Sequence, residues 1–486
     1  MKFFEKYYLY LTVFVTGAVI LVLEILGTRI VAPYYGTTIY AWSSLIGVTL
    51  MALSLGYYSG GRLADRKPKV EFLYSIVFLA ALSIVVIPLI MDSVLVGVNF
   101  LGPRFGALMS AALLFAVPLF LLGMVSPYAI KLKTKDMERV GVTAGNLYGV
   151  ATVGSFVGAI LAGFYLIPNL GINSITYLMG GLLVLVVAPY GVTSGKKLFS
   201  VGVVLMFLLV VMIPQIMSAD VSDDDVRVIY ETESPYASLK VVDYDINPTH
   251  TFRYLLVDGA THTEYDLEKK EFNFNYLRLL EKIKDYRPDA KSLLVVGLGG
   301  GGIEQKFEGF EIDTVELDPK VVDIAREYFD FEGDVIIDDG RHYIKNTDKK
   351  YDLIALDVFN GYSIASNLLT KEAFTETKAV LPEDGILVIN SHGWDNDELS
   401  KSIYKTLSEV FDYVYVKAMG YGHTNIIYYA SDAEISLDRQ FITLKMTADE
   451  DTIILTDDYN PADTMNIANA EAFRENTMEH LNNVAI

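Results

Sequence analysis

The sequence contains no cysteine among its 486 residues. This absence excludes disulfides, thiol nucleophiles and cysteine-ligated metal sites. Histidine is scarce as well: the six histidines are scattered and show neither HxH nor HxxxH spacing, so we expect no metal site. Thiol chemistry and metal chemistry are therefore the first function classes that the composition argues against.

Acidic residues are rare in the first part of the chain and abundant in the rest. Residues 1–218 contain 14 Lys and Arg against 7 Asp and Glu, whereas the remainder contains 25 basic and 53 acidic residues, for a net charge of −21. An acidic surface repels the phosphate backbone, so we expect no nucleic-acid partner. The length and this asymmetry together predict more than one domain.

Long uncharged apolar segments recur through residues 1–218 and predict a multi-spanning α-helical membrane domain. The first segment follows Lys2 and Lys6 but lacks a small-residue cleavage site and contains Glu24, which favours a retained span over a removed signal peptide. We expect about seven helices, near residues 7–28, 39–61, 72–91, 106–130, 142–166, 171–190 and 197–217.

Polar and small residues inside these spans suggest specific roles. Glu24 and Arg29 near the end of the first span are either an ion pair that anchors the helices or part of a polar pocket for a substrate from the bilayer. Small residues recur at a spacing typical of close helix contacts in lipid. They are Gly145, Gly149, Gly154, Gly158 and Gly163.

The basic residues of the predicted loops bear on the topology. They cluster at Lys2/Lys6, 62–69, 131–139 and Lys196/Lys197, and the alternate loops are nearly free of them. The positive-inside rule therefore places the N-terminus in the cytoplasm. Seven spans would then place the acidic half outside the cell, although nucleotide-like cosubstrates are cytoplasmic.

Beyond residue 218 the pattern changes to short strands. Residues 219–288 read as a small β-rich segment with strands at Ser238–Tyr244 and Tyr254–Val257, followed by helical periodicity over Glu268–Asp285. Strands and helices then alternate over residues 289–486. The strands are expected in LLVVG, IDTVELD, VIIDDG, DLIALDV and GILVIN, an order that predicts an α/β domain with a parallel, doubly wound sheet.

A glycine-rich loop follows the first of these strands. Gly297, Gly299 and Gly302 fit the GxGxxG template, Gly301 lies between them, and Glu316 follows about twenty residues after the loop begins, at the end of the next strand. Such a loop lets backbone N–H groups approach a nucleotide, and the acid can accept both ribose hydroxyls. The motif alone does not distinguish a dinucleotide from another nucleotide.

Other acids fall at the carboxyl ends of the predicted strands, where ligands bind in such sheets. Asp338 or Asp339 could accept a hydrogen bond from the exocyclic amino group of adenine, and Asp357 could face the transferred group. Each could also be an exposed acid on an acidic surface. Their common location together with Glu316 favours the ligand-binding interpretation.

Several motifs, in order, resemble the spermidine synthase superfamily, and especially members fused to an N-terminal membrane region. In the second half these are LLVVGLGGGG, TVELDPKVVDIA, DDGRHYI, YDLIALDVFNGYSIASNLLTKEAF and LTDDYNP; in the first half they are LEILGTRIVAPYYGTTIYAWSSLIGVTL and LGYYSGGRLADR. The resemblance implies a Rossmann-like transferase domain. It also implies S-adenosylmethionine or its decarboxylated form as cosubstrate, with Glu316 at the ribose, Asp339 at the adenine and Asp357 at the amine end.

Two departures from the family pattern affect the expected reaction. Gly300 stands where the family carries an amine-binding acid, and Asn360 replaces the second acid of its DxxD motif. An amide cannot act as the base, so standard spermidine synthesis should be impaired. Other acids near the pocket, such as Asp258, Glu264, Asp357 or Asp458, would then have to serve in catalysis.

The sequence thus favours a membrane-anchored transferase that moves an aminopropyl or other alkyl group to an amine or a membrane-associated, lipid-like or small-molecule acceptor. One alternative is a non-enzymatic ligand-binding, scaffold or transport protein with a degenerate synthase domain. A dinucleotide-dependent reductase is a poorer third interpretation. A homo-oligomer is compatible with each of them.

Overall fold

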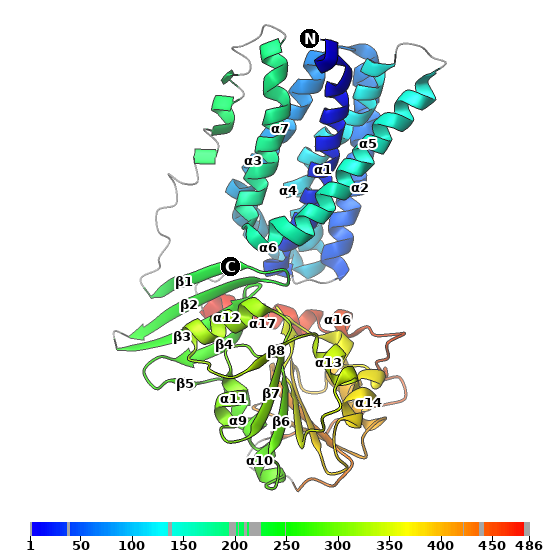
Figure 1. Cartoon of the computed structure of the whole chain (residues 1–486). Helices are drawn as coiled ribbons and strands as arrows, with labels where there is room; N and C mark the ends of the chain where they lie inside the picture. The colour runs from blue at the N-terminus through cyan, green and yellow to red at the C-terminus, as the bar shows by residue number, and fades with distance from the viewer. Residues whose placement is uncertain are drawn as a thin grey trace. The chain divides into compact units, whose positions relative to one another are not determined.

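A computed structural model describes most of the chain. The described residues are 2–35, 39–134, 139–193, 201–202, 204–208, 211–212, 225–247, 249–420, 422–436 and 442–480. They divide into two compact units, Met1–Val221 and Ser222–Ile486. We describe each unit by itself, and Figure 1 labels their elements.

The first unit is a helical bundle. Among the described residues, six helices are long and apolar enough to cross a membrane, because each contains an 18-residue window of high hydropathy with at most two charged residues. The predicted seventh span, 197–217, lies largely outside the described residues. The long helices are α1 (Lys2–Tyr35), α2 (Ile39–Arg66), α3 (Val70–Gly97), α4 (Gly102–Lys133), α5 (Val140–Leu161, extended by a π-helical turn over Ala162–Leu166) and α7 (Ile172–Thr193); α6 (Ile167–Asn169) is a short turn.

Glycines set the closest helix contacts in this unit. A side chain at Gly154 or Gly158 of α5 would collide with the carbonyl oxygens of Phe14 or Ala18 on α1. A side chain at Gly56 of α2 would likewise collide with a carbonyl oxygen of α4. These glycines let the helix backbones approach closely, as small residues do in helix pairs that associate within lipid.

Only some of the glycines that were predicted to lie at helix contacts have this packing role. Nothing lies within 4 Å of a Cβ built at Gly145, Gly149 or Gly163. Gly154 and Gly158 therefore face α1, whereas the other three glycines face open space within the described part of the chain.

The second unit begins with a five-stranded antiparallel sheet in the order β1-β2-β3-β4-β5. The predicted strands at 238–244 and 254–257 are β2 and β3. The helical periodicity over Glu268–Asp285 is confirmed only from Tyr276 onward, in two short helices, because the first part of the stretch contains strand β5. The elements are β1 (Val226–Glu233), β2 (Ser238–Asn247), β3 (His250–Val257), β4 (Ala260–Asp266), β5 (Glu271–Phe272), α9 (Tyr276–Glu281) and α10 (Ile283–Tyr286).

The rest of the unit is an eight-stranded sheet in the order β15-β13-β14-β12-β9-β6-β7-β8. The five predicted strands, β6, β7, β8, β9 and β12, pair in parallel, which confirms the Rossmann-like fold. Strands β14, β13 and β15 extend one edge in antiparallel pairing. The strands are β6 (Ser292–Val296), β7 (Glu311–Glu316), β8 (Val335–Ile337), β9 (Leu353–Leu356), β12 (Ile386–Gly393), β13 (Tyr413–Ala418), β14 (Thr424–Ser431) and β15 (Ile442–Thr443).

Helices cover both faces of this sheet (Figure 1). Alternate strand residues pack against α9, α11 and α12 on one face and against α13, α14 and α15 on the other. Because β6 and β9 are buried on both sides, they read as continuous apolar runs. The remaining elements are α11 (Gly302–Lys306), α12 (Pro319–Tyr328), α13 (Gly340–Asn346), the hairpin β10 (Phe359–Asn360) and β11 (Ser363–Ile364), α14 (Lys371–Ala379), α15 (Glu398–Ser408), α16 (Ala462–Met465) and α17 (Ile467–His480).

The glycine contacts of the first unit predict different effects for two similar substitutions. Gly154→Leu should destabilise the bundle by about 1–3 kcal/mol, because the new side chain meets the Phe14 carbonyl of α1. Gly145→Leu, in the same helix, should be neutral or stabilising, because open space surrounds it and leucine favours helix. Thermal unfolding in detergent compares them; equal stability of the two variants would contradict the assigned interface.

Candidate nucleotide and transfer site

The glycine loop joins β6 to α11 at the carboxyl edge of the parallel sheet. Gly297, Gly299 and Gly301 have φ values of 95°, 55° and 95°, in the region that favours glycine. The Gly297 N–H donates to the Val315 carbonyl at 2.9 Å, and a side chain at Gly297 would collide with the Asp357 carbonyl. The loop is thus held between the ends of β7 and β9.

Glu316 braces this loop from the end of β7. Its Oε2 accepts from the Leu298 N–H at 3.0 Å, and its Oε1 accepts from the Asp318 N–H at 2.8 Å. Burial raises the pKa of Glu316, and these backbone donors oppose the rise. Each carboxylate oxygen can accept a second bond, so the predicted ribose-binding role is compatible with this geometry.

A cavity of about 210 Å³ opens beside the loop. Two of its lining residues, Asp357 and Glu264, are acids, and no Lys or Arg is among the described residues that line it. Five aromatic side chains supply much of the remaining wall. The lining residues include Gly299, Gly300 and Gly302 of the loop, Thr261 to Glu264 of β4, Phe272, Phe274, Tyr276, Phe359 and Phe473, and the polar residues Asn390, His392, Asn425 and Asn476.

Hydrogen bonds fix the carboxylate of Asp357 at the cavity wall. Its Oδ2 accepts from the Tyr276 hydroxyl at 2.7 Å, and its Oδ1 accepts from the Asn390 Nδ2 at 2.8 Å. Asn390 in turn accepts from the Asn425 Nδ2 at 3.0 Å. Burial raises the pKa of Asp357, while the two donors to it lower the pKa. The carboxylate is therefore oriented, but no cationic side chain among the described residues pairs with it.

Two histidines line the same cavity. Burial lowers the pKa of His262 to about 4, and its Nε2 lies 2.9 Å from the Gly361 carbonyl oxygen, to which the neutral ring donates. Burial also lowers the pKa of His392 to about 3, and its ring stacks on Phe473 with centroids 4.6 Å apart. Both are neutral at pH 7, so the charge of the lining is set by its acids.

Sequence reasoning missed most of these lining residues. Asn390 ends the predicted strand GILVIN, so the rule about strand ends could have identified it. His392 follows two residues later, at the end of the same strand β12. Tyr276 and His262 carry no comparable local signal, because distant segments bring them to the cavity.

The other predicted ligand acids lie at the same sheet edge but not among the residues that line the cavity. Both oxygens of Asp338 lie within 2.9 Å of the His342 Nδ1, and this bond, first among several causes, lowers the pKa of Asp338. Asp339 caps α13 by accepting from the His342 N–H at 2.9 Å. These contacts give both acids a structural role at the start of α13.

Two predicted catalytic acids are not brought to the cavity. Asp258 lies in the β3–β4 turn with a φ of 48°, is 2% exposed, and accepts from the Ser238 N–H at 2.9 Å. Asp458 is exposed in the segment after β15. Of the four predicted catalytic acids, Asp357 and Glu264 line the cavity, whereas Asp258 and Asp458 are not among its lining residues.

The predicted membrane-pocket residues belong to α1. Glu24 and Arg29 are both half-buried there. A separate apolar groove between α2 and α4, lined by residues such as Met51, Leu55 and Phe120, includes neither of them.

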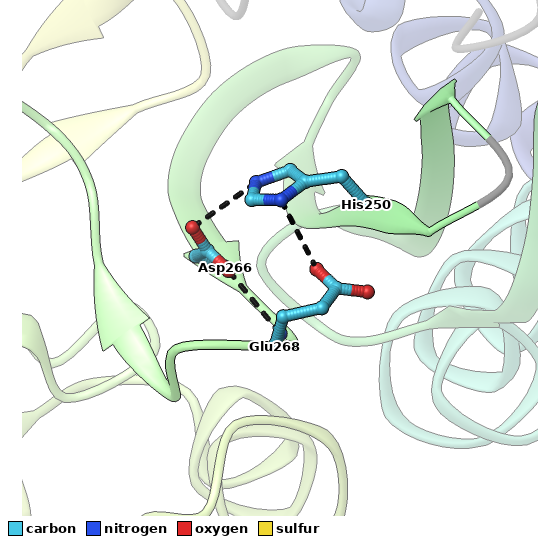
Figure 2. A group of neighbouring side chains, drawn as sticks. All are labelled: His250, Asp266 and Glu268. Carbon is cyan, nitrogen blue, oxygen red and sulfur yellow. Dashed lines mark hydrogen bonds and ion pairs between the residues drawn. The ribbon is translucent and has the colours of Figure 1, made fainter.

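A separate polar cluster lies on the small antiparallel sheet. Figure 2 shows its three side chains, His250, Asp266 and Glu268, pointing toward one another. The imidazole lies between the two acids, with Nε2 3.2 Å from Asp266 and Nδ1 3.8 Å from Glu268. A metal could take only one of these nitrogens. The Lys269 ammonium already lies 3.0 Å from the Asp266 Oδ2, so we interpret the group as an ion-pair cluster.

The second unit is similar in sequence to known proteins. Residues 279–480 match the family model described as the spermine/spermidine synthase domain. The polyamine aminopropyltransferase of Vibrio vulnificus is 33% identical over 176 residues, which cover 34% of this chain and 59% of that protein. The corresponding enzyme of Clostridium beijerinckii is 32% identical over 180 residues, covering 34% and 62%. The chain thus spans less than two thirds of these relatives.

Solved structures are similar as well. A probable spermidine synthase from Corynebacterium glutamicum is 24% identical, with a TM-score of 0.39, covering 42% of this chain and 80% of that one. A spermidine synthase in complex with the transition state analogue AdoDATO is 21% identical, with a TM-score of 0.35, covering 53% and 88%. The match of residues 279–480 to the spermine/spermidine synthase domain agrees with the glycine loop and the strand order observed in the second unit.

Proposed function

We propose that the second unit is an alkyltransferase that binds S-adenosylmethionine or its decarboxylated form and alkylates an amine or a membrane-associated acceptor. The observation that carries this proposal is the cavity at the glycine loop, with the oriented carboxylate of Asp357, inside a spermine/spermidine synthase domain. Relatives that share this domain are polyamine aminopropyltransferases.

The charge of the cavity suits a sulfonium ligand. Asp357 and Glu264 supply negative charge, and the aromatic walls, including Phe272 and Tyr276, can stabilise a cation through their ring faces. In the transfer, the acceptor nitrogen attacks a carbon bonded to sulfur. The C–S bond breaks, a C–N bond forms, and the sulfur leaves as a neutral thioether.

Such a reaction depends chiefly on alignment and on exclusion of water. Asp357 would hold an ammonium of the cosubstrate or acceptor through a charge-assisted hydrogen bond, while Tyr276 and Asn390 keep its oxygens in place. Glu316 would hold the ribose diol from the other side of the loop. No base is assigned, and the side chain of Asn360, where the family carries an acid, lies outside the described residues.

The surroundings of Gly300 support a reaction other than standard spermidine synthesis. A Cβ at Gly300 would lie 2.6 Å from the Thr263 Cγ2, 2.9 Å from the Phe272 Cε1 and 3.2 Å from the Phe329 Cγ. Neighbouring side chains thus fill the space that an acid would need. The packing around the loop is matched to glycine at this position.

The helices of the first unit would anchor the transferase domain to a membrane, close to a lipid-associated acceptor. The side on which the domain lies depends on the number of spans. Six spans return the chain to the side of the N-terminus, whereas a seventh at 197–217 carries it across. With that span and a cytoplasmic N-terminus, the second unit would lie outside the cell.

Ligand binding is the first test. The full chain in detergent should bind S-adenosylmethionine or its decarboxylated form in calorimetric titration. Asp357→Asn should weaken binding about 10- to 100-fold, because it removes a charged acceptor from the cavity. Asp458→Asn, at an exposed position, serves as the control and should bind like the parent. Absence of binding of both ligands at millimolar concentration would favour the scaffold alternative.

The packing at Gly300 gives a second test. Gly300→Asp should destabilise the protein by about 1–3 kcal/mol, because its Cβ meets Thr263 and Phe272. Thr263→Ala in the same chain should recover part of that loss by removing Cγ2, a coupling that a double-mutant cycle in thermal unfolding measures. Gly420→Asp is the control, since nothing lies within 4 Å of its Cβ. An additive double mutant would show that the loop does not meet Thr263.

The compartment is tested by labelling a chain that has no cysteine of its own. Asp323→Cys places a thiol on the exposed side of α12. A membrane-impermeant maleimide should label it in intact cells if the second unit is external, as seven spans predict. Labelling only after lysis would place the domain in the cytoplasm and reject 197–217 as a span; the parent chain controls for background.

A further inference from the structure

An acid that the sequence analysis did not identify follows the glycine loop directly. Glu304 lies in the first turn of α11, two residues after Gly302, which lines the cavity. Its Oε1 accepts from the Thr314 hydroxyl at 2.7 Å. Its Oε2 is buried and has no hydrogen-bond partner among the described residues. An unsatisfied buried carboxylate oxygen is costly, so this position needs a physical explanation.

The groups around Glu304 increase that cost. The titratable side chains that interact with it are Glu316 from β7, Asp357 after β9 and Tyr276 from α9. Among the described residues, none of the three carboxylates forms an ion pair with Lys, Arg or His. Their hydrogen-bond donors are hydroxyls, an amide and backbone N–H groups. Burial is the largest cause that raises the pKa of Glu304, to about 7, and the charges of Asp357 and Glu316 add to it.

A cation in the adjoining cavity would change this balance. It would attract all three carboxylates and favour the ionised form of Glu304, the one whose charge the fold tolerates least. The glycine loop itself provides no acid at Gly300, and its space there is filled. The negative charge that an acid at Gly300 would have supplied can therefore come from Glu304.

We propose that Glu304 is a counterion that ionises when a cationic ligand occupies the glycine-loop cavity, so that binding releases a proton from its carboxyl group to solvent. This inference rests on the proposed function, because it takes a sulfonium nucleoside as the cation. It makes Glu304 a positioning residue for the ligand's charge and gives it no part in bond making.

Proton release is measured by calorimetric titration of the full chain in detergent, in two buffers of different ionisation enthalpy, from pH 6 to pH 8. Decarboxylated S-adenosylmethionine is the probe, because its primary alkyl ammonium resembles that of lysine and stays charged over this range. The parent should release close to one proton at pH 6 and almost none at pH 8. Its affinity should rise about tenfold between these pH values, since the cation binds the ionised form of Glu304 more tightly than the protonated form.

Two variants isolate Glu304. Glu304→Gln should bind without proton release and with equal affinity at pH 6 and pH 8. Glu311→Gln, an exposed acid at the start of β7, is the matched control and should behave like the parent. Thr314→Val keeps Glu304 but removes its hydrogen-bond donor, which raises the pKa of Glu304 further and should move the transition to higher pH.

The possible results separate the two proposals. Binding that is independent of pH in the parent, or a pH dependence that persists in Glu304→Gln, overturns the role of Glu304 and leaves the proposed function standing. An unchanged transition in Thr314→Val overturns it as well, even if Glu304→Gln fails to fold. Absence of binding by the parent at every pH refutes both proposals together.

Discussion

The close approach of two strand ends is the constraint on which the second unit depends. At Gly297 the backbone leaving β6 packs so tightly against the Asp357 carbonyl, at the end of β9, that no side chain fits. Glu316 ties the same loop to the end of β7 through the Leu298 N–H. These contacts bring the loop after β6 and the acids at the ends of β7 and β9 to one edge of the sheet, where parallel folds bind ligands.

This arrangement has an electrostatic consequence. Glu304, Glu316 and Asp357 converge around the loop without a paired base among the described residues. In a fold built only for stability, buried acids of this kind would be paired or replaced by apolar groups. A cation bound from outside the chain, such as a sulfonium ligand, would supply the positive charge that these carboxylates lack.

The walls of the cavity come from elements that have little else in common. Strand β4 supplies His262 and Glu264, the segment from β5 to α9 supplies aromatic rings, and α17 supplies Phe473. The neutral histidines and asparagines leave the acids to set the charge. The small antiparallel sheet is thus a part of the site, since β4 forms one of its walls.

The sequence by itself predicted the elements whose signals are local. Apolar runs of spanning length identified all six described candidate spans, and short apolar runs alternating with helical segments identified the five parallel strands. The placement of Gly297, Glu316 and Asp357 at strand ends followed from that order alone. A loop or strand boundary is encoded in a few adjacent residues, which explains why these predictions agree with the structure.

Only the tertiary structure decided which side chains meet. Asp258 and Asp458 are acids of the expected kind, yet Asp258 is buried in a turn and Asp458 is exposed. Tyr276, Asn390 and Glu304 lie around the loop, although the sequence analysis did not assign them to the site. The stretch 268–285 has helical periodicity but forms β5 and two short helices. Contacts between distant segments depend on packing and burial across the whole unit, and the periodicity of a single segment does not contain that information.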